Sequence, residues 1–169
     1  MPKPSTNSYA PYFQRYIDQV PETDLNAAFQ NQAAGLNDFF NTITEEKSGY
    51  AYAEGKWTIK ELLQHIIDAE RIFAYRALCF ARGEKISLPG FDENEYAANS
   101  NGNGRTWKSL VEEFLAVRKS TELLFESFSE EALNNPGLSN NNTTTAASLG
   151  FITVGHYYHH KKILEERYL

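Results

Sequence analysis

Histidine is the residue whose placement in this sequence points most directly to chemistry. The chain has four histidines, and three of them, His156, His159 and His160, lie together in "GHYYHHKKIL". The fourth, His65, lies far upstream in "WTIKELLQHIIDAER". Neutral imidazole is a good ligand for Zn, Ni, Fe and Cu, so histidines that a fold brings together can form a metal site.

The spacing of His156 and His160 places both on one helix face. Each helical residue turns about 100°, so positions four apart point in nearly the same direction. The two histidines continue an apolar stripe formed by Leu149, Ile152 and Ile163, which predicts that they face the core. Two inward-facing imidazoles need partners for their nitrogens.

The other two histidines have different predicted positions. His159 lies about 100° around the helix from His160, so we expect it at the edge of the helix or in solvent. A helix register shifted by one position would instead let His159 act as a ligand. His65 lies on the flank of an apolar stripe and meets His156 and His160 if the two helices are neighbours.

Two interpretations of these histidines follow from spacing alone. One is a divalent metal site with three histidine ligands, which leaves open positions for water or substrate, as in catalytic sites. The other is a set of core histidines that are satisfied by the protein or by water. An HxxxH pattern also occurs by chance, so spacing alone does not choose between them.

The helix that carries His65 has the clearest start in the sequence. Thr58 is followed three residues later by Glu61, the pattern of a capping box. We predict that this helix runs to about Arg82 and ends at Gly83.

Three further long helices are predicted from apolar residues at helical spacing. They are expected from about Asp24 to Glu46, from Trp107 to Phe128 with Thr106 as cap, and from about Ala146 to Arg167. Residues 1–21 are expected to form an N-terminal arm over the core, with a short helix in "PYFQRYIDQV". Strand signals are weak throughout, and residues 1–169 are read as a single domain.

A long connection separates the second and third predicted helices. Residues 83–105 are rich in Gly, Asn and Pro, so we expect them to be mostly irregular. At about 3.3 Å per residue they reach roughly 75 Å, which is twice the ~37 Å length of the second helix. The third helix can therefore run parallel to the second. This predicts an all-α four-helix bundle with a long crossover, in up-down-down-up order, and the crossover is a candidate lid or cleft wall.

Composition excludes several classes of function. The net charge of −6 argues against a nucleic-acid backbone as the main partner. No stretch approaches the roughly 18 apolar residues of a membrane span, and no secretory signal is evident, so we expect a cytoplasmic protein that does not engage a membrane. The single cysteine, Cys79, is read as a small buried hydrophobe rather than a nucleophile.

The chain resembles the DinB-like superfamily of helical-bundle proteins. The resemblance rests on "KWTIKELLQHIIDAERIFAYRAL" and "GHYYHHKKIL", and it extends to "LPGFDENEYA" and "TWKSLVEEFLAVR". It implies that His65, His156 and His160 bind a divalent metal, with Zn or Ni preferred and Fe or Mn as alternatives. It also implies parallel second and third helices, and that the protein forms a homodimer.

The resemblance implies two classes of function. The first is a metal-dependent enzyme that acts on a small molecule, either a thiol-dependent S-transferase with a low-molecular-weight thiol or a hydrolase. The alternative is a non-catalytic metal-binding or stress-response bundle protein. A fourth protein ligand that closes the metal site favours the second class, whereas a cleft that reaches the metal favours the first.

Five further residues are candidates for supporting roles. Glu61, Asp68 and Tyr157 lie within a turn of the expected ligands, so they are candidate acceptors for the second imidazole N–H. Arg71 and Arg76 are candidates to bind an anionic substrate, with a salt bridge to a nearby acidic residue as the competing interpretation.

Overall fold

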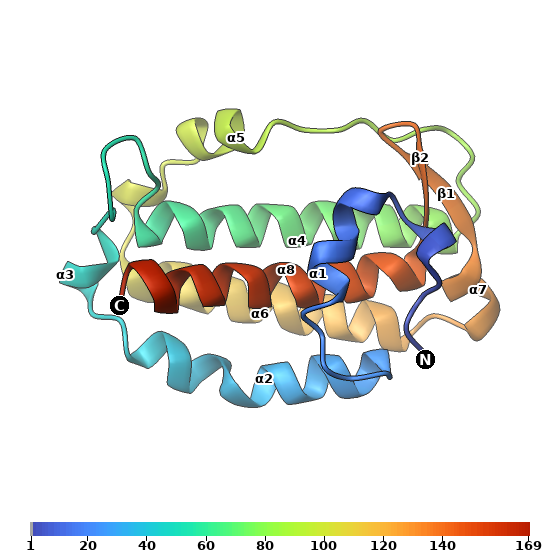
Figure 1. The fold of residues 1–169 in the computed structure, drawn as a ribbon, viewed down its shortest axis with the longest axis horizontal. Coiled ribbons are helices and arrows are strands. Elements are labelled where there is room, and N and C mark those ends of the chain that lie inside the picture. The colour runs from blue at the N-terminus through green and yellow to red at the C-terminus, as the bar shows by residue number, and fades with distance from the viewer. Residues whose placement is uncertain (1) are drawn as a thin grey trace.

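Four long helices lie side by side in the computed structural model, which describes residues 2–169 (Figure 1). They are α2 (Leu25–Asn41), α4 (Ile59–Ala81), α6 (Trp107–Glu126) and α8 (Ala146–Arg167). Helices α4 and α6 run in the same direction, and α2 and α8 run opposite to them (Figure 1). The predicted up-down-down-up bundle is therefore confirmed, and the bounds of α8 are those predicted.

The start of α4 is the predicted capping box. The Thr58 hydroxyl accepts a hydrogen bond from the Glu61 backbone N–H at 3.1 Å, and the Glu61 carboxylate accepts one from the Thr58 N–H at 2.8 Å. At the other end, Gly83 has φ +83°, a conformation that suits glycine. These two signals set the length of the helix that carries His65.

Helix α2 is shorter than predicted. It ends at Asn41, and a separate short helix, α3 (Glu45–Ser48), follows. The Thr44 hydroxyl accepts a hydrogen bond from the Lys47 N–H at 3.1 Å and caps α3. The prediction to Glu46 was wrong because threonine at this position favours the start of a new helix over continuation of the old one.

The crossover is more ordered than predicted. It returns along α4 and contains the helix α5 (Glu93–Asn99) and the 3-10 turn η3 (Gly102–Gly104) (Figure 1). The Asp92 carboxylate caps α5 by accepting hydrogen bonds from the N–H groups of Asn94 and Glu95 at 2.8 and 3.0 Å. A helix this short shows no usable hydrophobic periodicity, so only its cap was visible in the sequence.

A β-hairpin between α6 and α8 was missed. Helix α7 (Glu130–Asn134) is followed by β1 (Pro136–Ser139) and β2 (Asn142–Thr145), which pair in antiparallel fashion. The two turn residues, Asn140 and Asn141, have φ values of 48° and 59°. Asparagine tolerates the positive φ that a two-residue hairpin turn requires, so "NN" was the available signal.

The hairpin is attached to the start of the crossover. The Leu88 N–H donates to the Leu138 carbonyl and the Asn140 N–H donates to the Leu88 carbonyl, both at 2.9 Å. These two backbone bonds hold the hairpin turn beside the crossover near the end of α4.

The N-terminal arm crosses the middle of α8. It contains η1 (Thr6–Ser8), η2 (Pro11–Phe13) and α1 (Gln14–Ile17), and α1 packs on α8 (Figure 1). A Cβ at Gly155 would lie 2.0 Å from the Tyr16 carbonyl oxygen. The absence of a side chain at Gly155 therefore permits the close approach of the arm.

Helix α8 is the central helix of the bundle. Every residue from Ala146 to Tyr157 is buried, against α2, α4, the arm and the hairpin. A helix that is buried all round needs apolar or small residues on every face, as this segment has. No helix in the described part of the chain is long and apolar enough to cross a membrane.

A buried ion pair joins the helices at the centre of the bundle. Arg118 of α6 donates from Nε and Nη2 to the two carboxylate oxygens of Glu70 of α4 at 2.9 and 2.8 Å. It also bonds Gln32 of α2, whose Nε2 donates to the Val154 carbonyl of α8 at 3.0 Å. Each charge is thus paired and hydrogen-bonded inside the core.

Candidate metal centre

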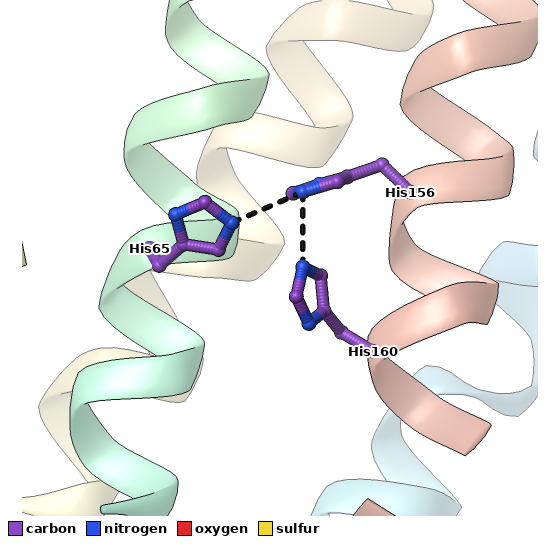
Figure 2. Close-up of side chains that lie close together, drawn as sticks. All are labelled: His65, His156 and His160. Carbon is purple, nitrogen blue, oxygen red and sulfur yellow. Dashed lines mark hydrogen bonds between the residues drawn. The ribbon is translucent and has the colours of Figure 1, made fainter. Parts of the chain in front are cut away.

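Three histidines from two helices converge on one point (Figure 2). His156 Nε2 of α8 lies 3.1 Å from His65 Nε2 of α4 and 3.0 Å from His160 Nε2 of α8. The ligand atoms of all three lie within 4.8 Å of one another. The convergence follows from the one-turn spacing on α8 and the packing of α8 against α4.

The imidazoles are held by aromatic neighbours. The Trp57 ring lies 4.9 Å from the His65 ring, and the rings of Tyr16 and Phe73 meet His156 edge-on at 5.3 and 5.7 Å. His156 is only 4% exposed and His160 is 9% exposed. The triad is therefore oriented by packing, with His65 the most accessible of the three.

Hydrogen bonds among the three imidazoles cannot satisfy all of their ring nitrogens. His156 Nε2 faces two imidazole nitrogens, yet a neutral ring nitrogen carries either one proton or one in-plane lone pair. Only one of the two contacts can therefore be a well-aligned hydrogen bond. In addition, the buried His160 Nδ1 has no hydrogen-bond partner among residues 2–169.

The spacing of the nitrogens fits a shared metal ion. Two imidazole nitrogens that bind one ion at about 2.0–2.1 Å lie roughly 2.8–3.0 Å apart when the angle at the ion is 90° and roughly 3.3–3.4 Å apart when it is tetrahedral. The separations of 3.0 and 3.1 Å from His156 Nε2 to the other two rings lie between these two values. No histidine, cysteine, aspartate or glutamate of the described residues adds a fourth ligand atom to the group. His65, His156 and His160 can thus hold a divalent ion and leave coordination positions open.

Burial keeps the triad in the form that binds metals. It lowers the pKa of His65 to about 4 and lowers the pKa values of His156 and His160 well below the ordinary 6.5. Repulsion between the neighbouring imidazoles, were they charged, acts in the same direction for His156 and His160. The three rings are therefore neutral at pH 7, as metal ligation requires.

A cleft of about 540 Å³ reaches the three histidines. Its walls come from four parts of the chain: the arm, α4, the crossover and the hairpin. The lining residues from these parts include Tyr12, Phe13, Arg15, Tyr16, Phe73, Arg76, Phe91, Glu93, Asn140 and Asn142. The crossover forms part of the cleft wall, as expected, through Gly90, Phe91 and Glu93.

The three predicted acceptors for the imidazole N–H groups make no hydrogen bond to the triad. Glu61 caps α4, and Asp68 accepts from Gln64 Nε2 at 2.9 Å. Tyr157 is buried in the core, where it stacks on Phe114 at 5.6 Å. These predictions were wrong because nearness in sequence does not fix direction: Asp68 and Tyr157 turn 60° and 100° away from the ligands beside them.

The two candidate arginines differ in their surroundings. Arg71 forms an ion pair with Glu113 at 2.5 Å, the competing interpretation from the sequence. Arg76 lines the cleft, where its Nη2 donates to the Pro89 carbonyl at 2.7 Å. Sequence reasoning missed Arg15 and Tyr16, because only the tertiary fold brings the arm to the site.

His159 and Cys79 lie outside the triad. His159 is half-buried at the edge of α8, with its Nδ1 3.3 Å from Gln19 Nε2 and its ring 5.3 Å from the Tyr16 ring. The alternative register, in which it replaces a ligand, does not occur. Cys79 is partly buried and packs against the core as a free thiol.

The sequence is similar to that of a known protein over part of its length. Over 68 residues the chain is 28% identical to "Putative metal-dependent hydrolase OB0413" of Oceanobacillus iheyensis. That match spans 40% of this chain and only 39% of the relative.

Two solved structures share the fold. YfiT from Bacillus subtilis, described as "a probable metal-dependent hydrolase with an unusual four-helix bundle topology", has a TM-score of 0.73 at 14% identity over 97% of this chain and 90% of its own. A mycothiol-dependent maleylpyruvate isomerase has a TM-score of 0.66 at 15% identity over 85% of this chain and 61% of its own. At such low identity the likeness shows the bundle topology.

The family assignment rests on a match over most of the chain. The model of the DinB superfamily matches residues 28–164, which include all three clustered histidines and exclude the N-terminal arm. This chain therefore belongs to the DinB superfamily.

Proposed function

We propose that this protein is a metal-dependent hydrolase of small molecules, with a divalent ion held by His65, His156 and His160. The observation that carries the proposal is a cleft that opens onto three convergent imidazoles with no fourth protein ligand from the described residues. Zn or Ni suits three neutral imidazoles best, with Fe and Mn as alternatives.

The chain and the ion have separate tasks in this proposal. When bound, the ion supplies Lewis-acid chemistry: it polarises a substrate oxygen and lowers the pKa of a coordinated water or thiol. The protein keeps the imidazoles neutral by burial and fixes their orientation through Trp57, Tyr16 and Phe73. The arm packs on α8, where the Tyr16 ring contacts the His156 ring.

The relatives support hydrolysis first and thiol chemistry second. One is described as a "putative" and another as a "probable" metal-dependent hydrolase. The isomerase with the same fold depends on mycothiol, and the cleft here is within the usual size range for a small-molecule ligand. Thiol-dependent transfer with a low-molecular-weight thiol is therefore the second candidate.

A purely structural metal is the alternative of a different class. Structural sites are usually closed by four protein ligands, whereas this group has three and borders a cleft. A chain of this length also buries a core large enough to fold without a metal staple. Both points favour a site that does chemistry.

Metal content is the first experiment. We expect about one ion per chain in untagged protein, and loss of that ion in His156→Ala, because two of the three ligands do not form a strong site. The matched control is His159→Ala, which removes a histidine of the same helix that lies outside the triad. Equal metal in wild type and His156→Ala, or loss in His159→Ala, would contradict the assignment.

Turnover then separates the functional classes. The metal-loaded protein is screened against small esters, lactones and amides, with and without added thiol. Turnover without thiol identifies a hydrolase, and turnover that requires thiol identifies a transferase. A full complement of metal with no turnover in either arm favours the non-catalytic alternative.

A further inference from the structure

We propose that the substrate of this cleft is an organic carboxylate, held by the guanidinium groups of Arg15 and Arg76 while its reacting group faces the histidine triad. The inference deepens the proposed function and rests on it for the identity of the reaction. The binding of the carboxylate itself requires no metal.

Arg76 lies on the same helix face as His65. Eleven residues separate them, which is about three turns and within roughly 20° in direction. The side chain is buried, with only 6% of the residue exposed, between Phe73, Phe91 and the Pro89 carbonyl. No carboxylate of the described residues lies within ion-pair distance. A guanidinium buried without a counter-charge is costly unless a ligand supplies that charge.

Arg15 reaches the same cleft from the arm. Its Nη2 donates to the Tyr16 hydroxyl at 2.8 Å, and its Cζ lies 3.9 Å from the centre of the Tyr12 ring. It pairs with no carboxylate in residues 2–169. Arg15 therefore places a positive charge in the cleft that the three histidines also line.

The arginines of the cleft lack carboxylate partners among residues 2–169, whereas several arginines on the neighbouring helices are paired with carboxylates. Arg71 and Arg105 pair with Glu113, and Arg118 pairs with Glu70. The cleft holds two cations against one carboxylate among its described lining residues, the exposed Glu93, which pairs with neither. The cleft thus keeps a positive excess in a chain whose net charge is −6.

The shape of the cleft limits the rest of the ligand. Its volume of about 540 Å³ suits one small molecule, and the rings of Tyr12, Phe13 and Phe91 form apolar walls. A planar guanidinium matches a carboxylate with paired hydrogen bonds. A molecule with an aryl or alkyl body and a carboxylate satisfies both features.

Because the arm supplies Arg15, it takes part in substrate selection. It lies outside the residues that match the family model, and its position depends on the close contact between Gly155 and Tyr16. The arm is therefore a part of the site that can set specificity independently of the metal ligands.

Binding of benzoate, compared with its neutral isostere benzamide, tests the proposal. Both are titrated by NMR into the protein of residues 1–169 after dialysis against EDTA, so that neither can bind through a metal. We expect benzoate to bind at least about tenfold tighter than benzamide, the effect of one charge-assisted hydrogen-bonded pair. Phenyl phosphate serves as the second anion.

Three variants assign the effect to residues. We expect Arg15→Gln and Arg76→Gln each to weaken benzoate binding about tenfold and to leave benzamide unchanged. Arg82→Gln is the matched control, since it removes an exposed arginine of the same helix end outside the cleft. Circular dichroism checks that each variant is folded. If the buried Arg76→Gln variant does not fold, the result for the exposed Arg15→Gln variant is used to test the proposal.

Each outcome decides the proposal. Equal binding of benzoate and benzamide, or no effect of the cleft variants, overturns it. Binding of phenyl phosphate more than about tenfold tighter than benzoate overturns the carboxylate assignment in favour of a phosphate. Because the titration uses metal-free protein, its failure and the absence of metal in the wild type are separate results.

Discussion

Acidification should destabilise the metal-free protein because its clustered histidines are buried in the neutral form. The folded pKa of His65 is lowered to about 4, mainly by burial, from an ordinary value of 6.5. Between these two values the unfolded chain binds a proton that the folded chain does not. Stability therefore rises with pH across this window, and it is lost as the pH falls from 6.5 toward 4.

The size of the effect follows from the shift. Each pH unit inside the window costs about 1.4 kcal/mol per histidine. His65 alone then removes about 2 kcal/mol of stability between pH 6.5 and pH 5. His156 and His160 add losses of the same sign, because their pKa values are also lowered. These losses are large against the 5–15 kcal/mol total stability that is usual for a domain.

Urea denaturation of EDTA-dialysed protein, followed by circular dichroism at about pH 7, 6 and 5, measures the effect. Wild type is compared with His65→Gln, so that contributions from carboxylates cancel in the difference. As the pH falls below 6.5, we expect the free energy of unfolding of the wild type to fall more steeply than that of His65→Gln. The difference between the two slopes should be about 1.4 kcal/mol per pH unit. Parallel curves for the two proteins would refute the claim that His65 is held neutral by burial.

Two further predictions concern stability. Gly155→Ala places a Cβ against the Tyr16 carbonyl oxygen, 2.0 Å away in the present structure, so we expect a loss of about 1–3 kcal/mol in urea denaturation. The matched control, Gly35→Ala on the exposed face of α2, meets nothing within 4 Å and should instead stabilise by about 0.5–1 kcal/mol; a similar loss in both would contradict the contact. Arg118→Leu leaves the Glu70 carboxylate unpaired in the core, so we expect a loss of about 3–5 kcal/mol by the same assay. A change below 1 kcal/mol would contradict the claim that the substitution leaves an uncompensated charge in the core.

Features that depend on neighbouring residues were predictable from the sequence. The capping box at Thr58 and Glu61 marks the start of α4, because its hydrogen bonds join residues three apart. The bounds of α8 and the shared face of His156 and His160 follow from helical geometry. The length of the crossover, compared with the helix it must retrace, allowed the parallel pair of helices that the family resemblance implied and that the structure shows.

Other features depend on competition between local signals. Thr44 begins α3 where the apolar pattern still allowed α2 to continue, and Asp92 caps a helix too short to show periodicity. In the sequence, the hairpin was indicated only by the pair Asn140 and Asn141. Both residues adopt the positive φ values that its turn requires. Such short elements are stable through packing on the bundle rather than through their own propensities.

Local patterns were sufficient to predict the four long helices, the shared face of the HxxxH pair and the family. The surroundings of the triad depend instead on tertiary packing. Asp68 and Tyr157 are near the ligands in sequence but point elsewhere, whereas Arg15, Tyr16 and Phe91 are distant in sequence and line the cleft. Local hydrogen bonds and helical geometry act over a few residues and can be read along the chain. The walls of the cleft are set by contacts such as that between Gly155 and Tyr16, which form only when distant segments pack together.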